Sequence, residues 1–162
     1  SLTGYRNWVD HALAANPDTR FFIALPWLTN PGSYDAAGYS ATWHASHDGP
    51  FHSIVDSLRE EYPGVDFYGI PYGQAAVELY SLYDAGRLPD VQTLVSGTDD
   101  AIFRDSFGHA DEILVELGRL VWLRAIYGVP LSSYDYDPGY ATDLKAIADA
   151  IMDGHDSDYD AP

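Results

Sequence analysis

The sequence predicts an α/β fold in which helices pack against parallel strands. Amphipathic and short apolar stretches alternate in the order helix, strand, helix, strand, helix, helix, helix, which is typical of α/β layering. The two apolar stretches, Arg20–Trp27 and Val65–Ile70, are nearly continuous, and a proline stands near the end of the first and directly after the second. Short apolar runs of this kind indicate buried parallel strands.

The helices are predicted from apolar residues that recur at helical spacing. In the first, Trp8 and Ala12 lie on one stripe, Thr3 is a plausible cap, and Asn16 before Pro17 ends the helix. Trp8 and Trp122 lie on such stripes, so we expect both in the core. The predicted helices are Tyr5–Ala15, Phe51–Tyr62, Gln74–Ala85, Ala110–Tyr127 and Asp143–Met152.

Two strands are fewer than a stable sheet usually has, since four to six are common. Either further strands lie in Leu28–Gly49 and Leu88–Phe103, or the chain is part of a larger unit. Leu28–Pro50 itself reads as a loop or a short helix, because Gly38 and the Ser/Thr content weaken a helix. We expect one α/β domain over residues 1–153, incomplete as a sheet, and an acidic, solvated tail over residues 154–162.

Composition excludes several classes of function. The formal charge of −17 comes from 25 acidic and 8 basic residues, which argues against nucleic acid and anionic membranes as partners. No cysteine is present, so disulfides, thiolate metal sites and a cysteine nucleophile are excluded. No apolar run is long enough to predict a transmembrane helix. The compartment stays open, with a periplasmic or secreted location slightly favoured.

The stretch "FRDSFGH" places Asp105 four residues before His109, just ahead of the longest helical pattern. A neutral imidazole can take the proton of a serine hydroxyl, and a carboxylate can orient the imidazole and stabilise its charged form. The pair therefore suits the acid–base part of a catalytic triad. The alternative is structural: Asp105 or Ser106 caps a helix, and His109 is a surface residue of its first turn.

The flanking segments carry a resemblance. A strand ending in "ALPW", a second strand in "VDFYGIPYG", and "FRDSFGH" leading into "VWLRAIYG" together resemble the C-terminal half of SGNH/GDSL-type hydrolases, over roughly Tyr5 to Pro130. The resemblance implies a three-layer α/β/α domain and a Ser-His-Asp triad, with His109 as general base and Asp105 as its orienting acid. It implies hydrolysis of acyl or acetyl esters of a carbohydrate or lipid, without a metal or organic cofactor.

The chain departs from the family pattern in two places. Its spacing is D-x-x-x-H, one residue longer than the usual D-x-x-H, and no nucleophile block precedes the first strand. We expect the serine and the oxyanion donors to come from a missing N-terminal half or a second copy of the chain. Ser40 in "GYSAT" and Ser1 in "SLTG" are the weaker candidates within the chain.

Aromatic and histidine side chains supply the remaining candidates. Trp27 and Tyr72 follow the two strands, where ligands of open α/β sheets bind, and with Trp43 they are predicted to contact a substrate. A second possible function is thus a non-catalytic domain that binds a ligand or partner through these aromatic loops. The cluster of His44, His47, Asp48 and His52 reads as a histidine-rich loop or cleft rim, and a metal site there is the weaker alternative.

Overall fold

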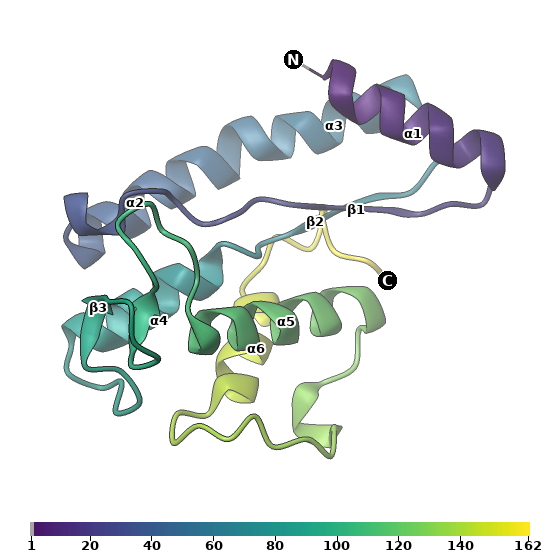
Figure 1. The fold of residues 1–162 in the computed structure, drawn as a ribbon. Coiled ribbons are helices and arrows are strands. Elements are labelled where there is room, and N and C mark those ends of the chain that lie inside the picture. Colours follow the sequence, from purple (N-terminus) through teal and green to yellow (C-terminus); the bar gives the residue numbers. More distant parts are fainter. Residues whose placement is uncertain (1) are drawn as a thin grey trace.

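The computed structural model describes residues 2–162 and confirms an α/β fold with parallel strands (Figure 1). The strands β1 (Phe21–Ala24) and β2 (Phe67–Ile70) pair in parallel, with Phe21 opposite Phe67. Helices cover both sides of this pair, so that three layers result (Figure 1). One side carries α1 (Thr3–Ala15) and α3 (His52–Glu61), and the other carries α4 (Gln74–Asp84), α5 (Glu112–Tyr127) and α6 (Leu144–Asp153).

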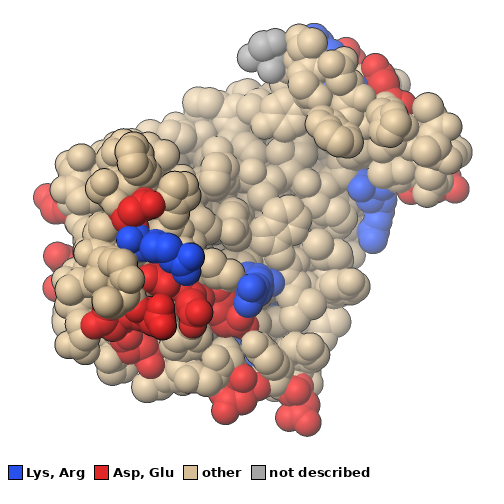
Figure 2. Space-filling view, in the orientation of Figure 1, with Lys and Arg blue, Asp and Glu red and all other residues tan. Residues whose placement is uncertain are grey.

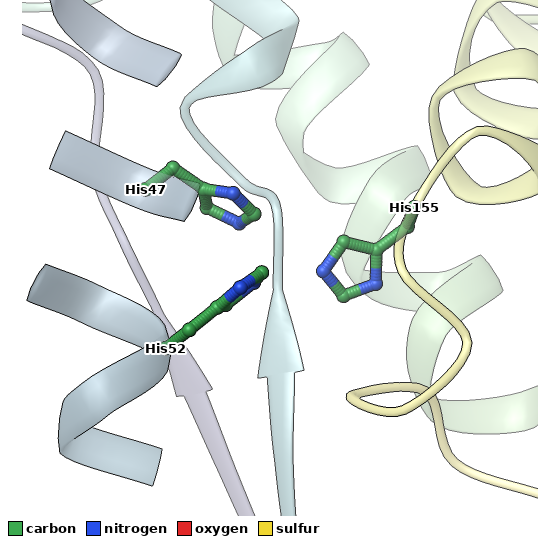
Figure 3. Close-up of side chains that lie close together, drawn as sticks. All are labelled: His47, His52 and His155. Atoms are coloured by element: carbon green, nitrogen blue, oxygen red, sulfur yellow. The ribbon is translucent and has the colours of Figure 1, made fainter. Parts of the chain in front are cut away.

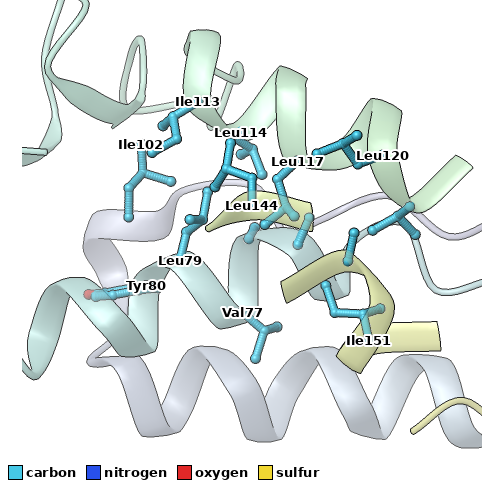
Figure 4. Packing of buried hydrophobic residues seen from close by; sticks show 14 of the residues in the cluster. Val77, Leu79, Tyr80, Ile102, Ile113, Leu114, Leu117, Leu120, Leu144 and Ile151 are labelled. Atoms are coloured by element: carbon cyan, nitrogen blue, oxygen red, sulfur yellow. The ribbon is translucent and has the colours of Figure 1, made fainter. Parts of the chain in front are cut away.

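The alternation of side chains along β1 explains the two hydrophobic cores. Phe21 and Ile23 pack into the smaller core, which includes buried residues of α1 and α3, whereas Phe22 and Ala24 pack against the larger core. The larger core joins α4, α5 and α6 (Figure 4). Its fully buried leucines include Leu79, Leu114, Leu117 and Leu144. The short sheet is therefore stabilised by burial of both faces rather than by its few strand hydrogen bonds.

Both ambiguous stretches contain regular structure. Leu88–Phe103 holds β3 (Thr93–Val95) and β4 (Ala101–Phe103), which form a second parallel pair. Leu28–Gly49 holds no strand; it contains the short turn η1 (Pro31–Ser33) and α2 (Ala36–Ser46), whose cap Asp35 accepts a hydrogen bond from the Gly38 amide. The π-helical turn η2 (His47–Phe51) then joins α2 to α3, and η3 (Leu131–Ser133) follows α5.

The first helix differs from the prediction in what it buries. Trp8 is 74% exposed, and Val9 is the buried residue of α1. The alanines that share the Trp8 stripe offer little apolar surface, so the helix packs through Val9 and Leu13 instead. Thr3 is the first helical residue rather than the cap. Trp122, also expected in the core, is half-buried and packs against the edge of the larger core.

The expected solvated tail packs against the sheet. The Gly69 amide of β2 donates a hydrogen bond of 2.8 Å to the Tyr159 carbonyl, and the Tyr159 hydroxyl donates to Asp56 of α3. Tyr159 is buried because its ring belongs to the smaller core. One aromatic residue thus anchors a segment whose composition otherwise favours solvent. Within residues 2–162, no helix has the length and apolar character needed to cross a membrane.

Asp90 fastens the start of α6 to the connection after α4, and its loss is predicted to destabilise the fold. Its carboxylate accepts hydrogen bonds from the Ala141 and Thr142 amides and from the Thr142 hydroxyl, at 2.5 to 2.9 Å. We expect Asp90→Asn to lower the free energy of unfolding by about 1–2 kcal/mol at neutral pH, measured by urea denaturation.

The pH dependence of this difference provides the control. Burial raises the pKa of Asp90, but the hydrogen bonds from Thr142 and Ala141 outweigh burial and leave the pKa below its usual value. A depressed carboxylate pKa stabilises the folded state above the unfolded pKa of about 3.9, and that contribution is lost as the pH falls through the folded value. The wild type and Asp90→Asn should therefore converge in stability as the pH falls from neutral through the folded-state pKa of Asp90. The prediction is contradicted if the free energies of unfolding of the wild type and Asp90→Asn differ by the same amount at neutral and at acid pH.

Candidate functional site

The acid–histidine pair lies on a closed loop between β4 and α5. The Arg104 amide donates to the His109 carbonyl at 2.7 Å, and the Asp111 amide donates to the Ile102 carbonyl at 3.0 Å. Asp111 caps α5, because its side chain accepts a hydrogen bond from the Glu112 amide. The reading of Asp105 or Ser106 as a helix cap is therefore wrong: the helix begins beyond His109.

Asp105 orients His109 through three contacts of one carboxylate. Its Oδ1 accepts hydrogen bonds from the amides of Phe107 and His109, and its Oδ2 lies 2.5 Å from His109 Nδ1. The hydrogen bond from His109 is the main cause of a lowered pKa at Asp105. The longer D-x-x-x-H spacing still permits this contact, because Gly108 turns the chain at a φ of 92°.

His109 presents its outer nitrogen to solvent. The side chain is 74% exposed, and no serine hydroxyl of residues 2–162 makes a hydrogen bond to its imidazole. Ser40 lies within α2 rather than at the end of a strand, and Ser1 lies outside the described residues. The loop thus holds an oriented imidazole that is largely open to solvent.

Two of the predicted substrate-binding aromatics support this loop. The Trp27 indole N–H donates to the Gly108 carbonyl at 2.8 Å, and the ring centroids of Trp27 and Tyr72 are 4.7 Å apart. Because Trp27 follows β1 and Tyr72 follows β2, the acid–histidine loop lies at the carboxyl ends of both strands. Ligands of open α/β sheets bind at that edge.

Trp43, the third predicted substrate contact, is an interior residue. Its side chain is 1% exposed, and its indole N–H donates to the Pro26 carbonyl at 3.0 Å. Its ring stacks on His47 with centroids 4.5 Å apart. The contact with His47 leaves little of Trp43 for stacking on a sugar or acyl group at the molecular surface.

The histidine-rich stretch contributes two residues to a buried cluster. His47 and His52 meet His155 from the C-terminal segment, and one ring nitrogen of each residue lies within 4.8 Å of the others. His44 is not part of this cluster. Its side chain is 43% exposed, and its Nδ1 lies 3.5 Å from Asp48 Oδ2. The sequence reasoning missed His155 because it assigned residues 154–162 to solvent; the one local signal is Tyr159, an aromatic residue in an acidic segment.

Burial disfavours the charged forms of His47 and His52. It lowers the pKa of His47 to about 4, and it also lowers the pKa of His52, with the charge of His155 as a further cause. The Nε2 atoms of all three histidines are buried and have no hydrogen-bond partner within residues 2–162. Each unpaired group costs about 1–3 kcal/mol of stability. Neutral imidazoles with unused lone pairs are the form in which histidine binds metal ions.

The surface charge is unevenly distributed. Figure 2 shows acidic side chains gathered on one part of this face, near the start of α5, with a few basic side chains beside them. A surface of this kind repels polyanions, in keeping with the net charge of −17. A neutral or cationic ligand therefore meets less electrostatic resistance here than a phosphate-rich ligand.

Comparisons of this chain with protein-family models, curated proteins and solved structures found no match. The resemblance to SGNH/GDSL-type hydrolases accordingly remains a prediction that rests on the motifs of the chain itself. The geometry of Asp105, His109 and the loop around them has to carry any functional assignment.

Gly108 is predicted to be required for the shape of the loop. A Cβ at this position would lie 3.1 Å from the Leu28 carbonyl oxygen and 3.4 Å from Pro31 Cδ, in addition to the positive φ. Gly108→Ala should therefore lower the free energy of unfolding by about 1–3 kcal/mol in urea denaturation.

Gly139→Ala separates the two causes. Gly139 has a similar φ of 80°, but a Cβ there would have no neighbour within 4 Å, so its variant measures backbone strain alone. Gly108→Ala should be the more destabilising of the two. Equal effects at both positions would mean that the contact with Leu28 and Pro31 contributes nothing.

Proposed function

We propose that this chain carries the acid–histidine part of a serine esterase of the SGNH type. The observation that carries the proposal is the 2.5 Å contact between Asp105 Oδ2 and His109 Nδ1, on a loop at the carboxyl ends of β1 and β2. The same contact occurs in the Ser-His-Asp arrangement, where the acid fixes the tautomer of the base. His109 is the general base, and Asp105 is its orienting residue.

The chemistry follows from the orientation of the imidazole. A proton on Nδ1 is donated to Asp105, so the lone pair of Nε2 points away from the carboxylate and toward solvent. As a serine oxygen attacks the ester carbonyl, Nε2 takes the hydroxyl proton and later returns it to the leaving alcohol. Asp105 stabilises the imidazolium that forms between these steps. No metal ion or organic cofactor enters this reaction.

The surroundings favour a small, uncharged acyl ester as substrate. Phe107 is exposed beside His109 and offers an apolar contact for an acyl chain. The acidic surface disfavours phosphorylated substrates (Figure 2). Acyl or acetyl esters of a carbohydrate or lipid meet both conditions. No serine hydroxyl of residues 2–162 makes a hydrogen bond to the His109 imidazole. In this proposal the serine and the oxyanion donors therefore come from a preceding segment or from a second copy of the chain.

The alternative of a ligand-binding domain without catalysis has less support. It requires Trp27, Tyr72 and Trp43 to offer free ring surfaces. Trp27 and Tyr72 pack on each other, and Trp43 packs on His47. These contacts suit residues that position the loop, not residues that stack on a ligand.

Removal of His109 is predicted to abolish ester turnover. In the complete enzyme, which includes the segment or second copy that supplies the serine, His109→Ala should lower kcat/KM for p-nitrophenyl acetate and butyrate by on the order of 10⁴-fold, because the base is lost. Asp105→Asn should lower kcat by on the order of 10²–10⁴-fold while leaving His109 in place, because the tautomer is no longer fixed. Initial rates over a range of substrate concentrations separate kcat from KM.

His11→Ala is the matched control, since His11 is an exposed histidine on α1 away from the loop. It should retain wild-type activity. In the assembled enzyme, with the segment or second copy that supplies the serine, a fluorophosphonate probe should label that serine, and it should react far more slowly when His109 is replaced by alanine. An adduct on Ser1 would place the nucleophile in this chain. Wild-type rates in the complete enzyme with His109→Ala, or no turnover of either ester by the complete wild-type enzyme, would refute the proposal.

A further inference from the structure

Three histidines from distant parts of the chain converge in the interior. His47 comes from η2, His52 from the first turn of α3, and His155 from the segment after α6. Figure 3 shows the three rings directed toward a common point. One ring nitrogen from each lies within 4.8 Å of the other two. This convergence shares no residue with the Asp105–His109 pair and does not depend on the proposed esterase function.

The converging atoms are buried and unused. The side chain of His47 is 5% exposed and that of His155 is 2% exposed. The Nε2 atoms of His47, His52 and His155 are all without a hydrogen-bond partner among the described residues. A polar atom in the interior ordinarily has a partner, and one unpaired nitrogen on each of three neighbouring rings indicates a ligand that accepts their lone pairs.

Carboxylates contact the Nδ1 atoms of two of the three histidines, on the other side of each ring from Nε2. His47 Nδ1 lies 2.8 Å from Asp48 Oδ1, and His155 Nδ1 lies 2.6 Å from Asp160 Oδ1. Each carboxylate accepts the Nδ1 proton, which places the lone pair on Nε2. Histidines that bind metal ions almost always donate their other ring N–H to such a partner. The arrangement is thus one that orients both rings for coordination.

The third ring is positioned by stacking. The rings of His52 and Tyr159 are nearly parallel, with centroids 3.7 Å apart, and the Tyr159 hydroxyl donates to Asp56. Tyr159 therefore holds His52 and, on the same segment, Asp160 holds His155. The C-terminal segment contributes one ligand and positions another.

A cavity of about 580 Å³ adjoins the three histidines. Its lining also includes Gln74 and Glu78 from α4 and Asp156 from the C-terminal segment. The Gln74 Oε1 atom is buried and has no hydrogen-bond partner in the part of the chain that the structure describes, while Gln74 Nε2 donates to Glu78 at 2.7 Å. Space and polar groups are thus present beside the histidines for a water molecule or a small ligand in a fourth coordination position.

We propose that His47, His52 and His155 bind a zinc ion through their Nε2 atoms, with a fourth position open to the cavity. Zinc prefers tetrahedral nitrogen coordination at about 2.0–2.1 Å, and three histidines with one exchangeable position form a known type of zinc site. Such ligands stand about 3.3 Å apart, so small rotations of these side chains close the present separation of up to 4.8 Å. The carboxylates of Asp48 and Asp160 complete the site from outside.

The test is zinc uptake by protein first stripped with a chelator. Dialysis against zinc followed by elemental analysis should give one zinc per chain, and isothermal titration should give the affinity. At zinc concentrations near 100 times Kd, Tm should rise by about 5–10 °C. Substitution with cobalt should give the visible absorption of a tetrahedral cobalt site.

Three variants locate the ion. His155→Ala should lose stoichiometric uptake and the rise in Tm. Asp160→Asn keeps all three ligands and should weaken zinc binding by about 10–100-fold. His44→Ala is the matched control, because His44 lies close in sequence to His47 but outside the converging set, and it should bind one zinc as the wild type does. Circular dichroism of each metal-free variant verifies that it is folded.

The outcomes that overturn the proposal are distinct. The wild type fails the test if it takes up less than half an equivalent of zinc or shows no rise in Tm. Undiminished uptake by a folded Asp160→Asn and a folded His155→Ala would place the ion elsewhere. Loss of uptake in His44→Ala with retention in His155→Ala would move the site to the exposed histidines of the α2–α3 junction.

Discussion

The parallel pairing of β1 and β2 is the contact on which the rest of the structure depends. Each strand has four residues, so the pair is stable only because helices cover both faces. The pairing also fixes where the chain leaves each strand. Trp27 and Tyr72 emerge at the same edge and pack on each other, and the acid–histidine loop rests on Trp27 through the Gly108 carbonyl. The pairing of β1 with β2 therefore positions Trp27, and through it the loop that carries His109.

The second consequence of this pairing lies at the other end of the chain. The C-terminal segment adds to β2 through the hydrogen bond from Gly69 to Tyr159, and the Cβ of Tyr159 would stand 3.3 Å from a Cβ at Gly69. The absence of a side chain at Gly69 therefore lets the segment approach. This approach carries His155 to His47 and His52. The three histidines come together because the C-terminal segment packs against β2, in addition to β1 and the helices.

Patterns in the sequence predicted those structural features that depend on residues close together in the chain. The α-helices other than α2 were predicted from periodicity, and the two longer strands from short apolar runs next to prolines. The contact of Asp105 with His109 needs only one turn of chain. β3 and β4 have three residues each, too few for a periodic signal. The exposure of Trp8 and the burial of His155 depend on which surfaces the tertiary fold brings together, and no pattern within α1 or the last residues encodes that.

The same device orients the histidines of both proposed sites, and burial separates their roles. In His109, His47 and His155 a carboxylate holds Nδ1, which leaves the lone pair on Nε2. His109 is largely exposed, so its Nε2 can exchange protons with a substrate and water, as a general base must. The interior opposes protonation of His47, whose pKa falls to about 4, so its lone pair stays available to a metal ion at neutral pH. Exposure suits the one histidine to proton transfer, and burial suits the others to coordination.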